Sequence, residues 1–232
     1  MKKIIKSLFL LVVLSACTSN NNHKMTVSGE IKGLKKGTLY LQKIKGGTLS
    51  TIDSIALEDT GVYELYSDGE SGTLHFLSLD KSNEKSIPFF GTPGVINIDS
   101  QLEKFVIQAK ISGSKNQEIL DNFNDIATKF QNQNLEMIKE SLEAQKEKDV
   151  EKVTAISKRQ QQQLRRKYLY TTNFAITHAD SEVAPYLALT VLNDANIKLL
   201  DTINQSLSAA IKNSTYGKEL KKYITSIKEI EK

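Results

Sequence analysis

The sequence is poor in the residues that carry most protein chemistry. It holds one cysteine, no tryptophan, three histidines and three prolines in 232 residues. A single cysteine excludes both a disulfide and a Cys-x-x-Cys redox pair within this sequence. No two histidines have metal-ligand spacing such as H-E-x-x-H, and there is no phosphate-binding glycine loop or G-x-S-x-G turn. We therefore predict no catalytic residue, no metal ligand and no cofactor.

The beginning of the sequence has the features of a secretory leader. Three lysines among the first six residues form a basic segment, and an apolar run fills positions 8–14. This run is shorter than the roughly 20 residues that a membrane-spanning helix needs. The stretch LSAC at 14–17 resembles the lipobox of bacterial lipoproteins, in which the leader is cleaved before the cysteine and the cysteine is acylated.

The resemblance to lipoproteins implies a lipoprotein signal peptide over residues 1–16 and lipidation at Cys17. Residues 17–24 then form the acylated cysteine and a polar tether. We expect a lipid-anchored protein of the cell envelope, held to the membrane by its acylated N-terminus. In bacterial lipoproteins an aspartate directly after the cysteine favours retention in the inner membrane. This chain has Thr18 there, and the absence of the aspartate favours the outer membrane, facing the periplasm. An ordinary signal peptide with a chance cysteine, or a buried N-terminal helix, is the alternative.

Loss of the leader changes the charge balance. The sequence carries 31 basic and 27 acidic residues, and the three leader lysines leave 28 basic residues against the same 27 acidic ones. A nearly neutral protein has no net electrostatic attraction for a polyanion. We expect no nucleic-acid partner.

Glycine divides the remaining chain into two regions. Eleven of the twelve glycines lie between Gly29 and Gly113, and glycine punctuates turns and weakens helices. Between them are about eight short runs in which apolar and polar residues alternate. This pattern predicts an antiparallel β domain over residues 25–113, either a sandwich or an open barrel.

Residues 114–232 have helical periodicity. Ser114 is followed three residues later by a glutamine, which fits a capping box, and apolar residues then recur at spacings of three, four and seven. Asp149 is placed to cap a second helix. The pattern predicts a long helical hairpin, although one continuous helix also fits. The fold class we predict is α+β, an N-terminal β domain followed by an all-helical region.

The first helix has apolar residues outside its main stripe. They are Leu135, Ile138 and Leu142. A second apolar edge of this kind predicts that the helix packs against two neighbours.

Several motifs occur in an order and spacing that resemble one family. They are GEIKG (29–33), GTLYL (37–41), TGVYEL (60–65), IPFFGTPGVINI (87–98), HADSEVAPYLAL (178–189) and STYGKEL (214–220). The chain resembles a domain of unknown function found N-terminal to the thioredoxin-like domain of lipid-anchored thiol–disulfide interchange proteins. These 232 residues contain no Cys-x-x-Cys and therefore no such redox domain. The resemblance carries neither redox activity nor a catalytic residue to this chain.

Two groups of residues are candidates for contact with a partner. Phe89 and Phe90 are adjacent in a predicted strand, so one of them faces outward unless another element covers it. The second group forms a basic stripe on the second helix and consists of Lys158, Arg159, Arg165 and Arg166. This stripe suits anionic lipid or an acidic partner. The alternative interpretation is an edge turn of the β domain for the segment with Phe89 and Phe90, and a solvated helix face for the basic stripe.

Three functional hypotheses remain open from the sequence. The first is a non-enzymatic binding or interaction module of the envelope with a protein partner, in its most specific form an accessory to a separate thiol–disulfide protein. The alternative is an envelope hydrolase whose site no motif reveals. The third is a structural remnant without a ligand. We expect a protein that is not an enzyme.

Overall fold

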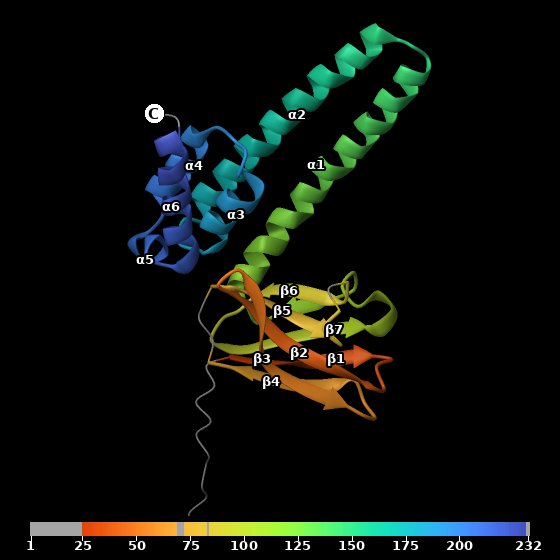
Figure 1. The fold of residues 1–232 in the computed structure, drawn as a ribbon, viewed down its shortest axis with the longest axis vertical. Helices are drawn as coiled ribbons and strands as arrows, with labels where there is room; N and C mark the ends of the chain where they lie inside the picture. Colours follow the sequence, from red (N-terminus) through yellow and green to blue (C-terminus); the bar gives the residue numbers. More distant parts are fainter. Residues whose placement is uncertain (1–24, 69–71, 83, 231–232) are drawn as a thin grey trace, which may run out of the picture.

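The chain folds into a β domain followed by a helical region (Figure 1). The computed structural model describes residues 25–68, 72–82 and 84–230. The expected leader, the lipidation site Cys17 and the tether lie outside the described residues. The predicted α+β class is confirmed.

Eight strands form two four-stranded sheets in the described part of the chain. The strand order is β4-β1-β7-β8 in one sheet and β3-β2-β5-β6 in the other. The strands are β1 (Met25–Lys32), β2 (Gly37–Lys45), β3 (Thr48–Leu57), β4 (Val62–Ser67), β5 (Leu74–Leu79), β6 (Ser86–Phe90), β7 (Gly94–Gln101) and β8 (Lys110–Ser112).

One strand pairing differs from the antiparallel arrangement that we predicted. Strand β1 runs parallel to β7, while the other pairs are antiparallel. The chain visits the second sheet between these two strands, which supplies the long crossover that a parallel pair requires. Alternation of apolar residues is the same for both strand directions, so the sequence pattern does not distinguish them.

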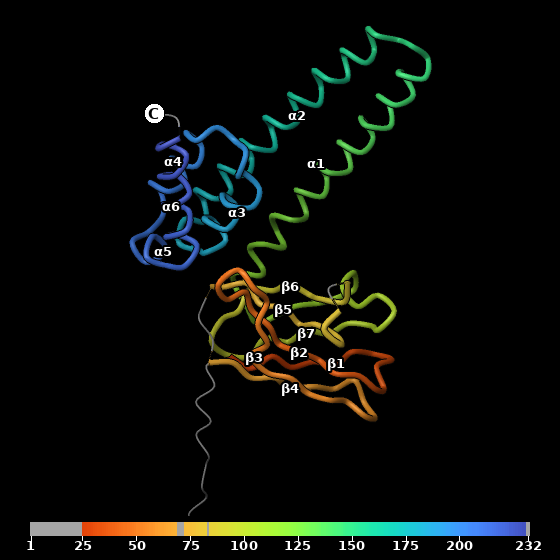
Figure 2. Tube along the Cα trace, viewed as in Figure 1, coloured from red at the N-terminus to blue at the C-terminus, as the bar shows by residue number. Residues whose placement is uncertain are grey.

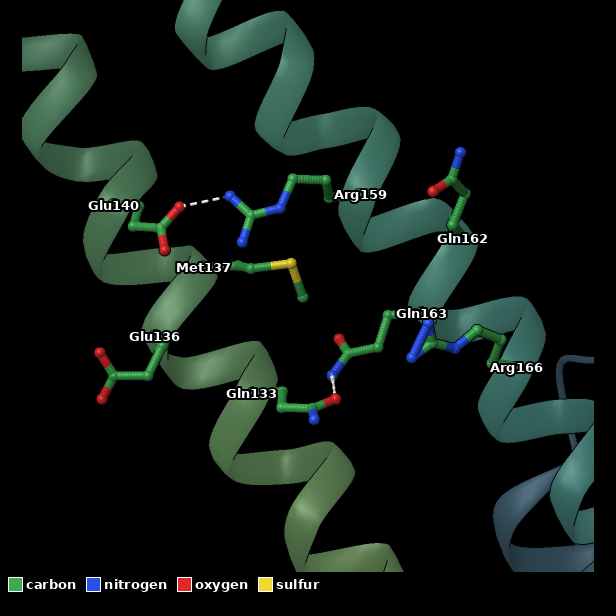
Figure 3. A pocket seen from close by; sticks show the side chains of 8 residues that line it. All are labelled: Gln133, Glu136, Met137, Glu140, Arg159, Gln162, Gln163 and Arg166. Atoms are coloured by element: carbon green, nitrogen blue, oxygen red, sulfur yellow. Dashed lines mark hydrogen bonds and ion pairs between the residues drawn. The ribbon is translucent and has the colours of Figure 1, made fainter.

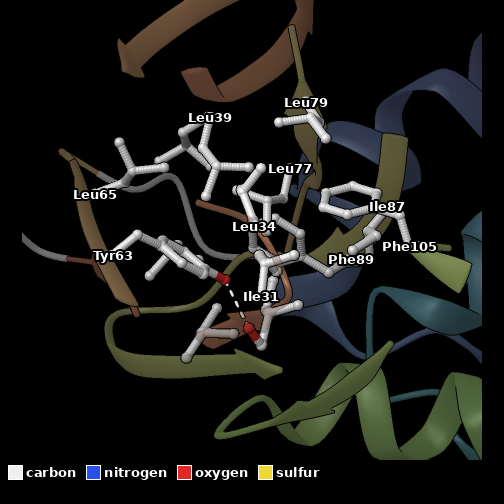
Figure 4. Close-up of a cluster of buried hydrophobic side chains, with 14 of the residues drawn as sticks. Ile31, Leu34, Leu39, Tyr63, Leu65, Leu77, Leu79, Ile87, Phe89 and Phe105 are labelled. Atoms are coloured by element: carbon white, nitrogen blue, oxygen red, sulfur yellow. Dashed lines mark hydrogen bonds between the residues drawn. The ribbon is translucent and has the colours of Figure 1, made fainter. Parts of the chain in front are cut away.

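The inner faces of the two sheets enclose one apolar cluster (Figure 4). Its fully buried members include Met25, Val27, Ile31, Leu39, Leu41, Leu65, Leu77, Phe89, Ile96 and Ile98. They come from alternate positions of the strands, as expected when one face of each strand is buried.

Side chains reinforce the parallel pair where its ladder is interrupted. Tyr63 of β4 lies opposite Gly29 of β1, and its hydroxyl reaches past β1 to donate to the Ile98 carbonyl oxygen at 2.7 Å (Figure 4). A Cβ atom at Gly29 would overlap that carbonyl oxygen. The Asp99 carboxylate accepts a hydrogen bond from the Glu30 amide at 2.8 Å. Burial raises the pKa of Tyr63, so its hydroxyl keeps its proton and donates.

Six helices follow the strands in the described chain. They are α1 (Lys115–Lys146), α2 (Val150–Thr177), α3 (Val183–Val191), α4 (Ile197–Ser206), α5 (Ala209–Lys212) and α6 (Thr215–Ile230). The long helices α1 and α2 run antiparallel and project from the rest of the molecule (Figures 1 and 2). Helices α3 and α4 pack on the C-terminal half of α2, and α6 packs on α3 and α4.

Both predicted N-cap residues are confirmed, although the Gln117 side chain bonds Phe90 and Asp121 and does not complete the predicted capping box. The Ser114 hydroxyl accepts a hydrogen bond from the Gln117 amide at 3.3 Å, and the Asp149 carboxylate accepts one from the Lys152 amide at 2.9 Å. Each cap satisfies an amide that the first turn of a helix leaves without a partner. The cap at Asp149 follows directly on the end of α1, so the predicted hairpin is confirmed.

A joint of four residues connects the β domain to the helices. We define it as Phe90, Gln117, Tyr186 and Tyr216. The Phe90 ring packs edge-on against Tyr186 and Tyr216, with centroid distances of 5.2 and 6.2 Å. The Phe90 amide donates to the Gln117 side-chain oxygen at 3.0 Å, and the Leu74 amide donates to the Tyr216 hydroxyl at 3.2 Å. The helices thus satisfy backbone groups at the ends of β5 and β6.

Polar contacts beside the joint fix α1 to the start of α3. The Asn116 amide group donates to the Glu182 carboxylate at 2.9 Å, and its oxygen accepts from the Ser181 hydroxyl at 2.8 Å. The Gln117 amide group donates to the Asp121 carboxylate at 2.7 Å. Burial raises the pKa of Asp121, and this hydrogen bond opposes the rise.

Replacement of Gly113 tests the connection between β8 and α1. Gly113 has φ +92°, and a Cβ atom there would overlap the Val95 carbonyl oxygen. We expect Gly113→Ala to lower the free energy of unfolding by about 2–4 kcal/mol in urea denaturation. Gly46 also has positive φ, at +59°, but nothing lies within 4 Å of its Cβ position. Gly46→Ala is the control and should cost about 1 kcal/mol; equal losses would show that the close approach to Val95 adds no strain.

A substitution of Gln117 tests the joint. Gln117→Leu leaves the buried Phe90 amide without its acceptor, so the free energy of unfolding should fall by about 1–3 kcal/mol. Gln145→Leu, an exposed position on the same helix, should change it by less than about 0.5 kcal/mol. Thermal unfolding of both variants measures the difference. An unchanged melting temperature for Gln117→Leu would show that the joint does not depend on this hydrogen bond.

Candidate functional site

A polar layer interrupts the core of the hairpin. The Gln163 side chain is only 8% exposed, and its amide group donates to the Phe130 carbonyl oxygen at 2.9 Å and to the Gln133 side-chain oxygen at 3.2 Å. On the side of the connecting loop lies a small apolar cluster of Met137, Ala144, Ile156 and Val153. On the other side begins the cluster that includes Phe90 and Phe123. Because the amide pairs only in one alignment, this layer fixes the register of α1 and α2.

A polar groove runs along one face of the hairpin (Figure 3). We define it by its lining residues, which are Gln133, Glu136, Met137, Glu140, Arg159, Gln162, Gln163 and Arg166. Its volume is about 390 Å³. The carboxylates come from α1 and the guanidinium groups from α2. Across it the Arg159 guanidinium donates to the Glu140 carboxylate at 2.6 Å.

The basic stripe expected from the sequence divides between two surfaces. Arg159 and Arg166 line the polar groove. Lys158 and Arg165 are exposed and line neither this groove nor the second groove described below. Residues seven apart share a helical row, but the two rows are offset by one residue, or about 100° around the helix. One row therefore faces the carboxylates of α1 and the other faces solvent.

A second groove, the apolar groove, lies on the other face of the hairpin. Its volume is about 650 Å³. It is lined by Phe123, Asn124, Ala127, Phe130, Gln131, Asn134 and Ile138 from α1, by Ser157, Gln160, Gln161, Gln163, Leu164 and Lys167 from α2, and by Val191 at the end of α3. The two grooves share Gln163. Lys167 is the one charged side chain among the described residues that line the apolar groove.

Large apolar side chains stand exposed on the hairpin, and two of them, Ile138 and Leu164, line the apolar groove. We call Leu135, Ile138, Leu142 and Leu164 the apolar edge; they are 55, 40, 54 and 47% exposed. The prediction that this edge of the first helix packs against a second neighbour is wrong for the described chain. The physical reason is the position of the shorter helices, which pack on the C-terminal half of α2 and leave the outer half of α1 uncovered.

Phe89 and Phe90 do not form a surface for a partner. Both are fully buried, Phe89 in the core between the sheets and Phe90 in the joint. The prediction was that one ring faces outward unless another element covers it. The structure shows this exception, because α1, α3 and α6 cover the ring of Phe90. The partner that the sequence suggested for this aromatic pair is another part of the same chain.

The described histidines have structural contacts. The His75 ring is buried in β5 and lies 3.0 Å from the Thr73 carbonyl oxygen, while His178 stacks on Phe174 at the end of α2. Within the described ranges no three His, Cys, Asp or Glu side chains gather as metal ligands would. None of the described helices is both long and apolar enough to cross a membrane.

The sequence pattern contains a signal for Gln163, although we did not predict a role for this residue. Gln163 is the last of four consecutive glutamines and lies seven residues from both Ile156 and Tyr170. Ile156 is buried, and Tyr170 packs on Phe123 with a centroid distance of 6.0 Å. A glutamine seven residues from two apolar residues of the inner stripe falls on that stripe.

Comparison with known proteins identifies one part of the chain. Residues 25–120 match the model of a family described as Domain of unknown function (DUF4369). No curated protein and no solved structure matches this chain. The match covers all eight strands and the first residues of α1, including Gln117 of the joint, but neither groove. The predicted resemblance to a domain of unknown function is confirmed for residues 25–120, which match this family model.

Proposed function

We propose that this protein is a non-enzymatic, lipid-anchored interaction module of the cell envelope whose helical hairpin binds a segment of another protein. The apolar edge carries this proposal. Four large aliphatic side chains stand 40–55% exposed on an element that projects from the molecule. Exposed apolar side chains that gather beside a groove mark interaction sites far more often than scattered ones do.

The architecture supports binding at the hairpin because it holds the groove in shape. The joint and the Asn116 contacts fix where α1 leaves the β domain. The Gln163 layer fixes how α2 lies against α1. A groove whose walls are already positioned loses less conformational entropy when a partner binds.

The sequence supports the anchor and one kind of partner. The basic segment, the short apolar run and the LSAC stretch favour acylation at Cys17. The motifs shared with domains that precede a thioredoxin-like domain favour a partner among separate thiol–disulfide proteins. In this proposal the anchor holds the β domain at the membrane, and the hairpin presents the apolar groove to that partner.

Removal of the thiol tests the anchor. The protein expressed in a bacterial host should incorporate a labelled fatty acid and sediment with membranes. Cys17→Ala should abolish the label and release the protein to the soluble fraction, because no acyl chain remains to enter the bilayer. Thr18→Ala is the control and should keep both properties. A wild-type protein that takes up no label would contradict lipidation.

Site-specific photo-crosslinking tests the interaction surface. A photoreactive residue at position 138 lies in the apolar edge, whereas one at position 143 lies on an exposed part of the same helix outside both grooves. In native membranes we expect a discrete adduct with one protein, identified by mass spectrometry, at position 138 and not at 143. Absence of an adduct at 138, or the same adducts at both positions, would rule out the apolar edge as the binding surface.

A further inference from the structure

We infer that the occupant of the apolar groove is an amphipathic helix whose apolar stripe is bordered by aspartate or glutamate. This inference rests on the proposed function, since it names the partner of the same surface. It comes from the unequal distribution of charge between the two faces of the hairpin.

Two carboxylates of the outer half of α1 face the polar groove. Glu136 and Glu140 line that groove, where Glu140 is paired with Arg159 and Arg166 supplies a second guanidinium. Opposite charges therefore already meet on this face within the chain. A charged partner gains little at Arg159 and Glu140, because it would have to displace charges that are already paired.

Lysines stand beside the apolar edge and in the apolar groove instead. Lys139 and Lys146 each follow a leucine of the apolar edge by four residues, which places them beside Leu135 and Leu142 on the same side of the helix. Lys167 lines the groove from α2. Positive charge therefore stands on both helices that form this groove.

These three lysines differ from Arg159 on the other face in their pairing. None of them takes part in an ion pair with another residue that the structure describes, whereas Arg159 does. A partner that places carboxylates beside them would add new pairs without breaking old ones. Exposed pairs contribute little affinity each, but they discriminate strongly against a partner of the same charge.

The shape of the groove favours a helix as the occupant. Leu135, Ile138 and Leu142 have the spacing i, i+3, i+7, so they follow one side of α1 over two turns. A third helix laid into the groove between two antiparallel helices buries such a row against its own apolar stripe. The amide side chains of Gln131, Asn134, Gln160 and Gln161 border the groove and add no charge of the opposite sign.

The same features disfavour two other occupants. A second copy of this hairpin bound through the same face would bring lysines against lysines. A membrane surface suits apolar side chains that protrude from a convex face, whereas Ile138 and Leu164 of the apolar edge line a hollow of about 650 Å³.

Matched synthetic peptides test the charge of the occupant. Two helical peptides share one apolar stripe, and its flanking positions carry Glu in one peptide and Lys in the other. Binding to the full chain is measured by fluorescence anisotropy at low and high salt. We expect the Glu peptide to bind at least about tenfold more tightly, and we expect this advantage to shrink at high salt because exposed charges are screened.

Paired variants locate the effect. Lys139→Glu with Lys146→Glu should reverse the preference between the peptides. Lys158→Glu with Arg165→Glu makes the same change of charge outside both grooves and should leave the preference as it is. Leu135→Gln with Leu142→Gln should weaken binding of both peptides at least about tenfold without lowering the unfolding midpoint, because both side chains are exposed in the free protein.

Each other outcome overturns the inference. Equal binding of the two peptides would rule out an acidic helix as the occupant. Binding to phosphatidylglycerol vesicles, with no binding to either peptide, would also rule it out. Sedimentation analysis could instead detect a dimer. If Leu135→Gln with Leu142→Gln abolishes that dimer, the occupant of this face is a second copy of the chain. An adduct at position 138 together with equal peptide binding would leave the proposed function standing and remove only the acidic helix. The absence of any adduct at 138 would remove the proposed function itself.

Discussion

Two adjacent phenylalanines on one strand impose the constraint on which the arrangement of the molecule depends. Neighbouring side chains of a strand point to opposite faces, so Phe89 and Phe90 cannot share one core. Phe89 fills the space between the sheets, and Phe90 needs a second apolar environment outside it. Helices α1, α3 and α6 provide that environment with Tyr186 and Tyr216. The need to bury one ring thus attaches the helical region to the β domain and sets where the hairpin begins.

The hairpin combines features that have different purposes. The polar layer around Gln163 contributes less apolar burial than a leucine would, but it allows only one alignment of the two helices. The ion pair between Glu140 and Arg159 lies in the polar groove, on the same face of the hairpin as the Arg166 guanidinium. The apolar edge has no equivalent compensation within the described chain. Stability and alignment are therefore provided on one side and in the middle of the hairpin, which leaves the other side available for binding.

Much of this architecture follows from the sequence, and the exceptions have physical causes. The glycine distribution and the residues Ser114 and Asp149 predict the two regions and the hairpin, because turns and caps are local properties. The parallel β1–β7 pair and the burial of Phe90 depend on contacts between distant segments, which local periodicity does not encode. The apolar edge is readable as apolar, but its exposure depends on where α3–α6 pack. The residues of the candidate site could therefore be identified from the sequence, but the sequence did not show that they form an exposed surface.

The polar layer at Gln163 also has a consequence for how the protein moves. Between this layer and the connecting loop the two helices are held by a small group of apolar side chains around Met137 and Ile156 and by the exposed ion pair between Arg159 and Glu140. On the other side of the layer the aromatic rings of Phe123, Tyr170 and Phe174 pack on one another. Local opening follows such differences in packing. The backbone amides in the outer half of the hairpin are therefore expected to exchange with solvent before those in its inner half, and a helix seated against Ile138 would slow that exchange.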